Sequence, residues 1–142
     1  LSEKNIDDEE WQKKINLHQK RRSKDWKLIE TTDLLNTLRN EEGPLLIDSI
    51  GGFVMKSIGK EQNEWSTKMN SLISLLMKRK SMTIIVGEQV GWSLVSEYKI
   101  GNTYIERIGE LQKRITKISK DNWLAINGRA IKIDEISIEI PT

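Results

Sequence analysis

Cysteine is absent from this chain of 142 residues, and histidine occurs once, at position 18. Without cysteine the protein has no disulfide framework and no thiolate chemistry, which is compatible with a reducing, cytoplasmic setting. One histidine without cysteine also cannot build an ordinary zinc site. No apolar run approaches the roughly 20 residues of a membrane span, and no signal-peptide pattern opens the chain. We therefore expect a cytoplasmic protein without a membrane span.

Several motifs that carry chemistry are missing as well. The chain contains no GxxxxGK[ST] phosphate-binding loop, no GxGxxG, no HExxH and no GxSxG. Positive and negative residues nearly balance, with 23 Lys and Arg and 21 Asp and Glu, which gives a net charge of +2. The protein as a whole therefore has no electrostatic pull toward nucleic acid or anionic membrane, and any basic site must be local.

The composition is that of an ordinary folded domain, with 37% hydrophobic and 31% charged residues. A chain of this length can bury one sizeable core, so we expect a single domain over residues 1–142. Helical stripes of apolar residues predict helices at 63–78 and 100–118, and Thr32 or Asp33 can cap another that Gly43 and Pro44 end. Residues 51–60 carry glycines and are ambiguous.

Short apolar runs alternate with these helices. They lie at 45–48, 83–88 and 123–126, the last followed by Asn127 and Gly128, and WKLIE at 26–30 has the pattern of a short strand. The tail 131–140 alternates with period two, as an edge strand or hairpin does. Apolar runs separated by helices are typical of parallel strands that are covered on both faces. We therefore expect an α/β fold with a doubly wound, mostly parallel sheet.

Ligands of such sheets bind at the carboxyl ends of the strands, where two acids stand. Asp48 directly follows the run LLI, as does an acid that holds magnesium in nucleotide-binding sheets, and Glu88 ends the next run. Acids at strand ends also serve as turn formers. Trp11, Trp65 and Trp123 are expected in the core, whereas Trp92, beside Gly91, is the tryptophan expected to line a pocket.

His18 lies in a segment, 7–24, whose acids crowd the start and whose bases crowd the end, as the helix dipole prefers. Trp11, Ile15, His18 and Arg22 share one helical face. Two interpretations fit this pattern: a half-buried histidine on an amphipathic helix, or a nucleophile placed where anionic phosphates gather.

Further sequence blocks decide between these two interpretations of His18. The IxxHxxRR block at 15–22, then WKLIE, LLIDSIGGFV, IIVGEQVGWSLV, YKIGNTYIERIGELQKRI and WLAINGRAIKI follow one another in this order. Together they resemble the adenosylcobinamide kinase/adenosylcobinamide-phosphate guanylyltransferase family, the bifunctional enzymes of cobalamin synthesis, above all the cyanobacterial versions. The resemblance covers nearly the whole chain, and the histidine block is its most specific part.

The resemblance implies roles for particular residues. His18 matches the histidine that GTP guanylylates, and the residues after it match a nucleotide-binding stretch: Gln19, Lys20, Arg21 and Arg22. Glu30 and Asp48 also match nucleotide-binding positions, with Asp48 as the candidate magnesium ligand. Ser2 and Glu3 match the end of a strand that borders the nucleotide. The implied substrates are GTP or ATP and adenosylcobinamide or its phosphate, and the implied cofactor is Mg²⁺.

The resemblance also implies a P-loop NTPase fold of the RecA-like type and a homo-oligomer, typically a trimer. The family begins with a strand and a P-loop, and we expect this chain, which starts at Leu1, to lie after both. The sequence departs from the family at Ser49, where many relatives have cysteine, and at Tyr104 and Glu106, which replace Phe and Asp. Ser93, Ser96 and Asn102 depart as well, replacing the usual glycine, proline and arginine.

Two other functions stay open at this point. A non-catalytic nucleotide-binding or regulatory module derived from the enzyme would also lack the phosphate loop. A nucleic-acid binder built on the bases at 20–24 is a weaker rival, since aromatic residues are not interleaved with them. We expect no nucleic-acid partner. A salt titration separates nucleic-acid binding from nucleotide binding, because nucleic-acid affinity falls steeply with salt whereas GTP binding should require magnesium.

Overall fold

The computed structural model describes residues 25–31, 33–92 and 97–140. The chain divides into two compact units, Leu1–Thr31 and Thr32–Thr142, which we treat separately. In the described part of the first unit, residues 25–31, no helix or strand forms. The strand expected at 26–30 is therefore wrong for these residues: period-two alternation needs a neighbouring strand to pair with, and no described strand pairs there. The expectation of one domain stays a prediction.

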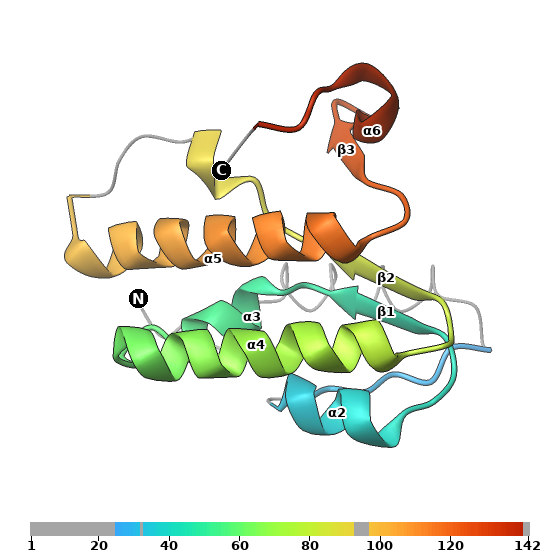
Figure 1. Cartoon of the computed structure of the whole chain (residues 1–142), viewed down its shortest axis with the longest axis horizontal. Coiled ribbons are helices and arrows are strands. Elements are labelled where there is room, and N and C mark those ends of the chain that lie inside the picture. Colours follow the sequence, from blue (N-terminus) through green and yellow to red (C-terminus); the bar gives the residue numbers. More distant parts are fainter. Residues whose placement is uncertain (1–24, 32, 93–96, 141–142) are drawn as a thin grey trace, which may run out of the picture. The chain divides into compact units, whose positions relative to one another are not determined.

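The second unit contains the remaining described elements (Figure 1). They are α2 (Leu34–Asn40), β1 (Leu45–Asp48), α3 (Gly51–Met55), α4 (Gln62–Lys78), β2 (Thr83–Val86), a 3₁₀ turn η1 (Val90–Trp92), α5 (Lys99–Ile118), β3 (Trp123–Ile126), β4 (Arg129–Lys132) and α6 (Ile133–Ile136). The order confirms the expected α/β alternation, and the ambiguous 51–60 segment contains the short helix α3. No helix among the described residues is long and apolar enough to cross a bilayer.

Local signals explain where the helices begin and end. Asp33 caps α2, since its side chain accepts a hydrogen bond from the Asn36 backbone N–H at 3.0 Å. Of the two expected caps, Thr32 lies outside the described residues, and α2 ends at Asn40, just before Gly43 and Pro44. Helices α4 and α5 begin within one residue of the expected positions and end where expected, because their apolar stripes are long and uninterrupted.

The strands β1 and β2 form a parallel pair, with Leu45 opposite Thr83 and Asp48 opposite Val86. The connection between them runs through α3 and α4, the crossover that parallel neighbours require (Figure 1). Because the strands are parallel and in this register, their carboxyl ends lie at the same edge. This edge carries Asp48 and, two residues beyond β2, Glu88.

One hydrophobic core joins α2, β1, α3, α4 and α5. Its buried members are Leu38, Ile47, Ile50, Val54, Trp65, Met69, Leu72, Ile73, Ile108, Leu111 and Ile115. Trp65 is at its centre with no exposed surface, which confirms its expected place in the core. Its indole N–H donates to Glu110 Oε2 at 2.8 Å, and the Arg107 guanidinium lies 5.4 Å from the ring centroid. Arg107 also donates to the Lys60 carbonyl at 2.5 Å, which fixes the loop before α4 to α5.

The apolar run at 123–126 corrects the expectation of a further parallel strand. As β3 it pairs antiparallel with β4 in a separate sheet of two strands. Asn127 and Gly128, both with positive φ (50° and 73°), make the two-residue turn that forces this hairpin. The edge strand or hairpin expected over the tail, 131–140, is wrong for most of it: β4 ends at Lys132 and α6 begins at Ile133, so only the first two residues of the tail lie in a strand.

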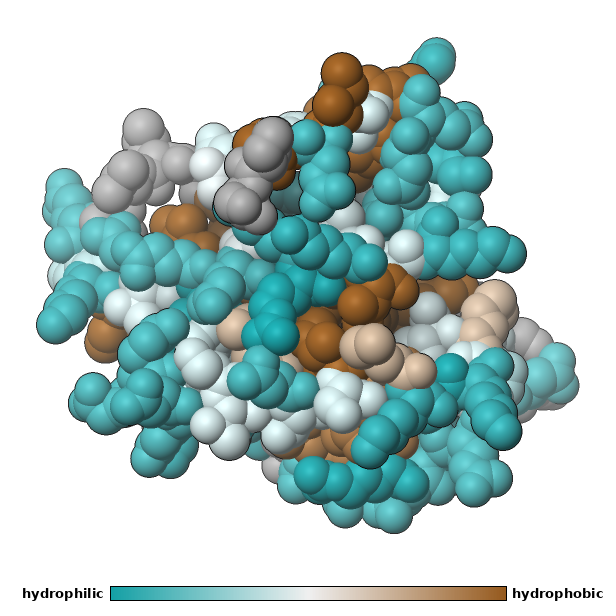
Figure 2. Space-filling model, viewed as in Figure 1, coloured by the Kyte–Doolittle hydropathy of each residue, from teal (hydrophilic) through white to brown (hydrophobic). Residues whose placement is uncertain are grey.

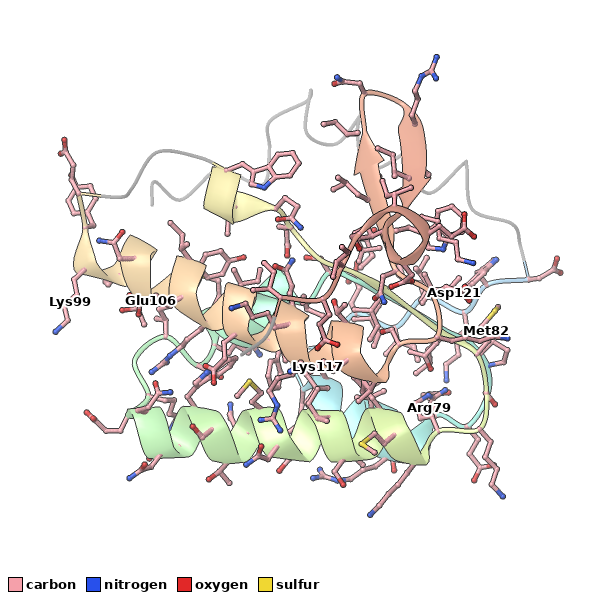
Figure 3. All side chains as sticks on the ribbon, turned by 45° about the horizontal axis from the view of Figure 1, so that its top comes forward. Arg79, Met82, Lys99, Glu106, Lys117 and Asp121 are labelled. Carbon is pink, nitrogen blue, oxygen red and sulfur yellow. The ribbon has the colours of Figure 1, made fainter. Side chains whose placement is uncertain are left out.

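The C-terminal elements expose apolar side chains. Trp123 is 59% exposed, so the expectation that it packs in the core is wrong. Beside it, Lys132 lies 6.0 Å from the indole ring centroid and forms an ion pair with Asp121 at 3.1 Å. Figure 2 shows hydrophobic atoms gathered where β3 and α6 lie in Figure 1. Lys117, near the end of α5, forms an ion pair with Glu139 at 3.7 Å, and Figure 3 labels Lys117 and Asp121 in this region.

Candidate active site

The site begins at the carboxyl end of β1. Asp48 is the last residue of this strand and its side chain is exposed, so its carboxylate is free to meet a ligand. After a cis peptide bond to Ser49, the chain turns into α3, and the Ile50 N–H donates to the Val86 carbonyl at 3.1 Å. This bond ties the turn after β1 to the end of β2. The backbone that carries Asp48 is thereby fixed on both sides.

Glu88 lies half-buried at the same edge. The Ser49 hydroxyl donates a hydrogen bond to Glu88 Oε1, which joins the ends of the two strands through side chains. The backbone of Glu88 is held in turn by Gln112 of α5, whose Nε2 donates to the Glu88 carbonyl at 2.9 Å. Its second carboxylate oxygen, Oε2, is buried and has no hydrogen-bond partner among the residues that the structure describes. A buried carboxylate oxygen without a donor is costly and requires an explanation.

Gly51 and Tyr104 complete the surroundings of Glu88. A Cβ atom at Gly51 would lie 2.4 Å from Glu88 Oε1 and 2.5 Å from the Tyr104 hydroxyl, so both oxygens lie close to the same point and close to each other. Burial raises the pKa of Tyr104 above its ordinary value, and the negative charge of Glu88 raises it further. The phenol is therefore held protonated beside a carboxylate.

Comparison with known proteins identifies the chain. The profile of the family described as cobinamide kinase / cobinamide phosphate guanyltransferase matches residues 2–133. The chain belongs to this family. The match confirms the resemblance seen in the sequence and makes the protein a member of an enzyme family of cobalamin biosynthesis, whose substrates are nucleotides and cobinamide. A search of curated proteins found no match.

The expected site residues of this cobinamide kinase / guanyltransferase family member fall into two groups. Most lie outside the described residues: Ser2, Glu3, His18, Gln19, Lys20, Arg21 and Arg22. Glu30 is described, as an exposed residue of the first unit, and Asp48 belongs to the second. The roles of all nine residues therefore stay predictions.

Several residues that meet at the edge of the sheet were not expected there. Glu88 attracted attention as a strand-end acid, but the sequence assigned no site role to Ser49, Gly51, Tyr104 or Gln112. No sequence motif predicts that these residues meet, because Ser49 and Glu88 are 39 positions apart. Trp92, expected to line a pocket, is 68% exposed in η1.

The donor set at this edge fits a magnesium ion bound with a nucleotide. Mg²⁺ usually keeps several waters and takes one or two carboxylates plus substrate phosphates, rather than a cage of protein ligands. Asp48 offers such an exposed carboxylate. Among the described residues no group of three or more acids or histidines gathers, so a site made entirely of protein ligands is not found there.

A cavity also lies away from this edge of the sheet. A cavity of about 590 Å³ is lined by Leu38, Arg39, Glu41, Glu42, Leu75, Lys78, Arg79, Lys80 and Ser81. Arg79, labelled in Figure 3 where α4 leads into β2, donates to the carbonyls of Glu41 and Gly43 and to Thr83 Oγ1. These bonds satisfy carbonyls at the end of α2 and fix the turn before β1. They are structural bonds within the fold.

Proposed function

We propose that the protein phosphorylates adenosylcobinamide and then transfers a guanylyl group from GTP to adenosylcobinamide phosphate, through a GMP–histidine intermediate on His18. The observation that carries this proposal is the family match over residues 2–133, which includes the IxxHxxRR block. The acid at the carboxyl end of a parallel strand supports it, because nucleotides bind at this edge in such sheets.

His18 supplies the nucleophile. A neutral imidazole nitrogen attacks the α-phosphorus of GTP; a P–N bond forms as the P–O bond to pyrophosphate breaks. A phosphate oxygen of adenosylcobinamide phosphate then attacks the same phosphorus, and the P–N bond breaks to release the guanylylated product. Lys20, Arg21 and Arg22 follow His18 by two to four positions in the sequence and offset phosphate charge, with arginine able to bind in bidentate fashion. Gln19, Ser2, Glu3 and Glu30 are proposed as further nucleotide contacts.

Asp48 holds the magnesium ion that accompanies the nucleotide. When bound, the ion neutralises phosphate charge. Asp48 suits this role because its carboxylate is exposed and stands on a backbone fixed by β1 and by the Ile50–Val86 hydrogen bond.

We also propose that β1 and β2 belong to a larger, doubly wound sheet of the P-loop NTPase, RecA-like type. Parallel strands are normally covered on both faces. In the pair described here Leu46, Ile84 and Val86 are between 40% and 47% exposed, so one face has room for further cover. A homo-oligomer, a trimer by resemblance, and a cytoplasmic location complete the proposal.

The test is a labelling experiment on the protein expressed from its full reading frame. Incubation with GTP labelled at the α-phosphate should leave acid-labile, base-stable label on the protein, as a phosphoramidate does. Label from the γ-phosphate should not remain. His18→Asn should abolish the adduct while sparing phosphorylation of adenosylcobinamide, because the two steps use different protein groups.

Three outcomes separate the hypotheses. An adduct that survives in His18→Asn would mean that the nucleophile is another residue. GTP binding without any adduct or transfer would favour the non-catalytic module. Binding of nucleic acid that falls steeply with salt, in the absence of magnesium-dependent GTP binding, would contradict the proposal altogether.

A further inference from the structure

The buried carboxylate of Glu88 has no role in the reaction as proposed above, and its surroundings suggest one. It is not an exposed ligand like Asp48, since Oε2 is buried and no described residue gives it a hydrogen bond. Its other oxygen accepts the hydroxyl proton of Ser49, the residue directly after Asp48 in the chain. Glu88 thus contacts the side chain of the residue next to Asp48.

Both ends of this hydrogen bond are fixed independently. Gln112 of α5 holds the Glu88 backbone at 2.9 Å, and the Ile50 N–H holds the turn after Ser49 to β2 at 3.1 Å. A side-chain hydrogen bond between two fixed backbones restricts rotation of both side chains. It also restricts the peptide that leads from Ser49 back to Asp48.

Tyr104 lies beside the same carboxylate. Its hydroxyl and Glu88 Oε1 both lie within 2.5 Å of the point where a Gly51 Cβ would stand, so only glycine leaves room for this arrangement. The phenol brings a second hydroxyl to the same carboxylate group. The hydrogen bond from Ser49, the fixed backbone and the close approach of Tyr104 together restrict the orientations open to the carboxylate.

We propose that Glu88 is a positioning residue for Asp48: acting through Ser49, with Tyr104 beside it, it holds the Asp48 carboxylate in the orientation that magnesium-bound nucleotide requires. This inference rests on the proposed function, in which Asp48 serves magnesium-nucleotide binding. Residues that orient a metal ligand typically change metal affinity about 10–100-fold when they are mutated. The same range is expected for Glu88.

The test measures the dissociation constant of GTP by calorimetry, with and without magnesium. Glu88→Met keeps about the same side-chain length but removes both acceptor oxygens, and should weaken magnesium-dependent GTP binding about 10–100-fold. GTP binding without magnesium should stay nearly unchanged. Ser49→Ala should show the same loss and Ser49→Thr, which retains the hydroxyl, should restore binding. Gln89→Ala, at the exposed neighbour of Glu88, is the matched control and should bind as the wild type does.

A double-mutant cycle distinguishes positioning from a general structural role. If Glu88 acts through Asp48, adding Glu88→Met to Asp48→Asn should cause no further loss of magnesium-dependent binding. Additive losses, or an unchanged dissociation constant in Glu88→Met with the fold intact by urea unfolding, would overturn the inference alone. A wild-type protein that binds no GTP in magnesium would overturn the proposed function and this inference with it.

Discussion

Gly51 and Gly52 form a matched pair of adjacent glycines at the start of α3, and their alanine variants should behave differently. A Cβ at Gly51 meets Glu88 Oε1 at 2.4 Å and the Tyr104 hydroxyl at 2.5 Å, distances that real Cβ atoms do not show. A Cβ at Gly52 meets nothing within 4 Å, and the residue is exposed. Neither glycine has a positive φ among the described residues, so the backbone itself admits alanine at both.

The magnitude follows from two opposing contributions. Alanine instead of glycine stabilises a helix by roughly 0.5–1 kcal/mol, and this contribution is shared by the two variants. Overpacking a filled site costs about 1–3 kcal/mol, and this cost falls on Gly51→Ala alone. The free energy of unfolding of Gly51→Ala should therefore lie about 1–3 kcal/mol below that of Gly52→Ala, because the shared helix contribution cancels in the comparison.

Urea unfolding followed by tryptophan fluorescence measures both variants on the same scale. Adding Tyr104→Phe to Gly51→Ala removes one of the two atoms that the new Cβ meets, and should recover part of the loss. Equal unfolding free energies for the two alanine variants would refute the close approach of Gly51 to Glu88 and Tyr104. The positioning role inferred for Glu88 would then lose its geometric basis.

Three further predictions test the fold around the site. Trp65→Ala should lower the free energy of unfolding by about 3–5 kcal/mol, whereas the exposed Trp123→Ala should change it by about 0.5 kcal/mol or less, as urea unfolding will show. Gly128→Ala should cost about 1–2 kcal/mol because φ is 73°, whereas Gly43→Ala, which has open space and no positive φ, should be close to neutral. Tyr104 should titrate above the ordinary tyrosine pKa, measured by tyrosinate absorbance once the chain's other tyrosine is changed to phenylalanine. Because the pKa of Tyr104 is raised in the folded state, the contribution of Tyr104 to stability is complete below the unfolded-state pKa and is lost as pH rises through the folded-state pKa. Tyr104→Phe removes this titration, so it should flatten the fall in stability at alkaline pH.

Elements governed by neighbours in sequence were predictable. The stripes of α4 and α5 place an apolar residue at every turn, so the pattern alone defines helices that end at Lys78 and Ile118. The strand at 45–48 ends at Asp48 as expected, because an acid ends the apolar run. Such elements can therefore be predicted from local periodicity.

Elements that depend on a partner strand were less predictable. Apolar runs at 83–86 and 123–126 look alike, yet the first pairs parallel with β1 and the second pairs antiparallel with β4. The difference comes from Asn127 and Gly128, whose positive φ values close a hairpin at once and leave no residues for a crossover. Likewise WKLIE has the alternation of a strand but no described strand to pair with.

The site shows the same division between local and long-range information. His18 and its basic neighbours were found from a contiguous block, and the family match supports the block without testing the roles of its residues. Glu88 and its partners were not assigned a site role, because Ser49, Glu88 and Gln112 come together only through the parallel pairing of β1 with β2 and the packing of α5. A sequence pattern cannot encode such a cluster at any fixed spacing.

Two departures from the family pattern meet at this cluster. By the resemblance to the family, Ser49 replaces a cysteine and Tyr104 a phenylalanine, and in the structure both hydroxyls lie beside the Glu88 carboxylate. A hydroxyl is a stronger hydrogen-bond donor than a thiol, and a phenyl ring has no donor at all. Each change therefore places a hydroxyl beside the same half-buried carboxylate. Substitutions that look unrelated in sequence, 55 positions apart, thus act on one group, and the hydrogen bond from Ser49 helps to hold that group in place.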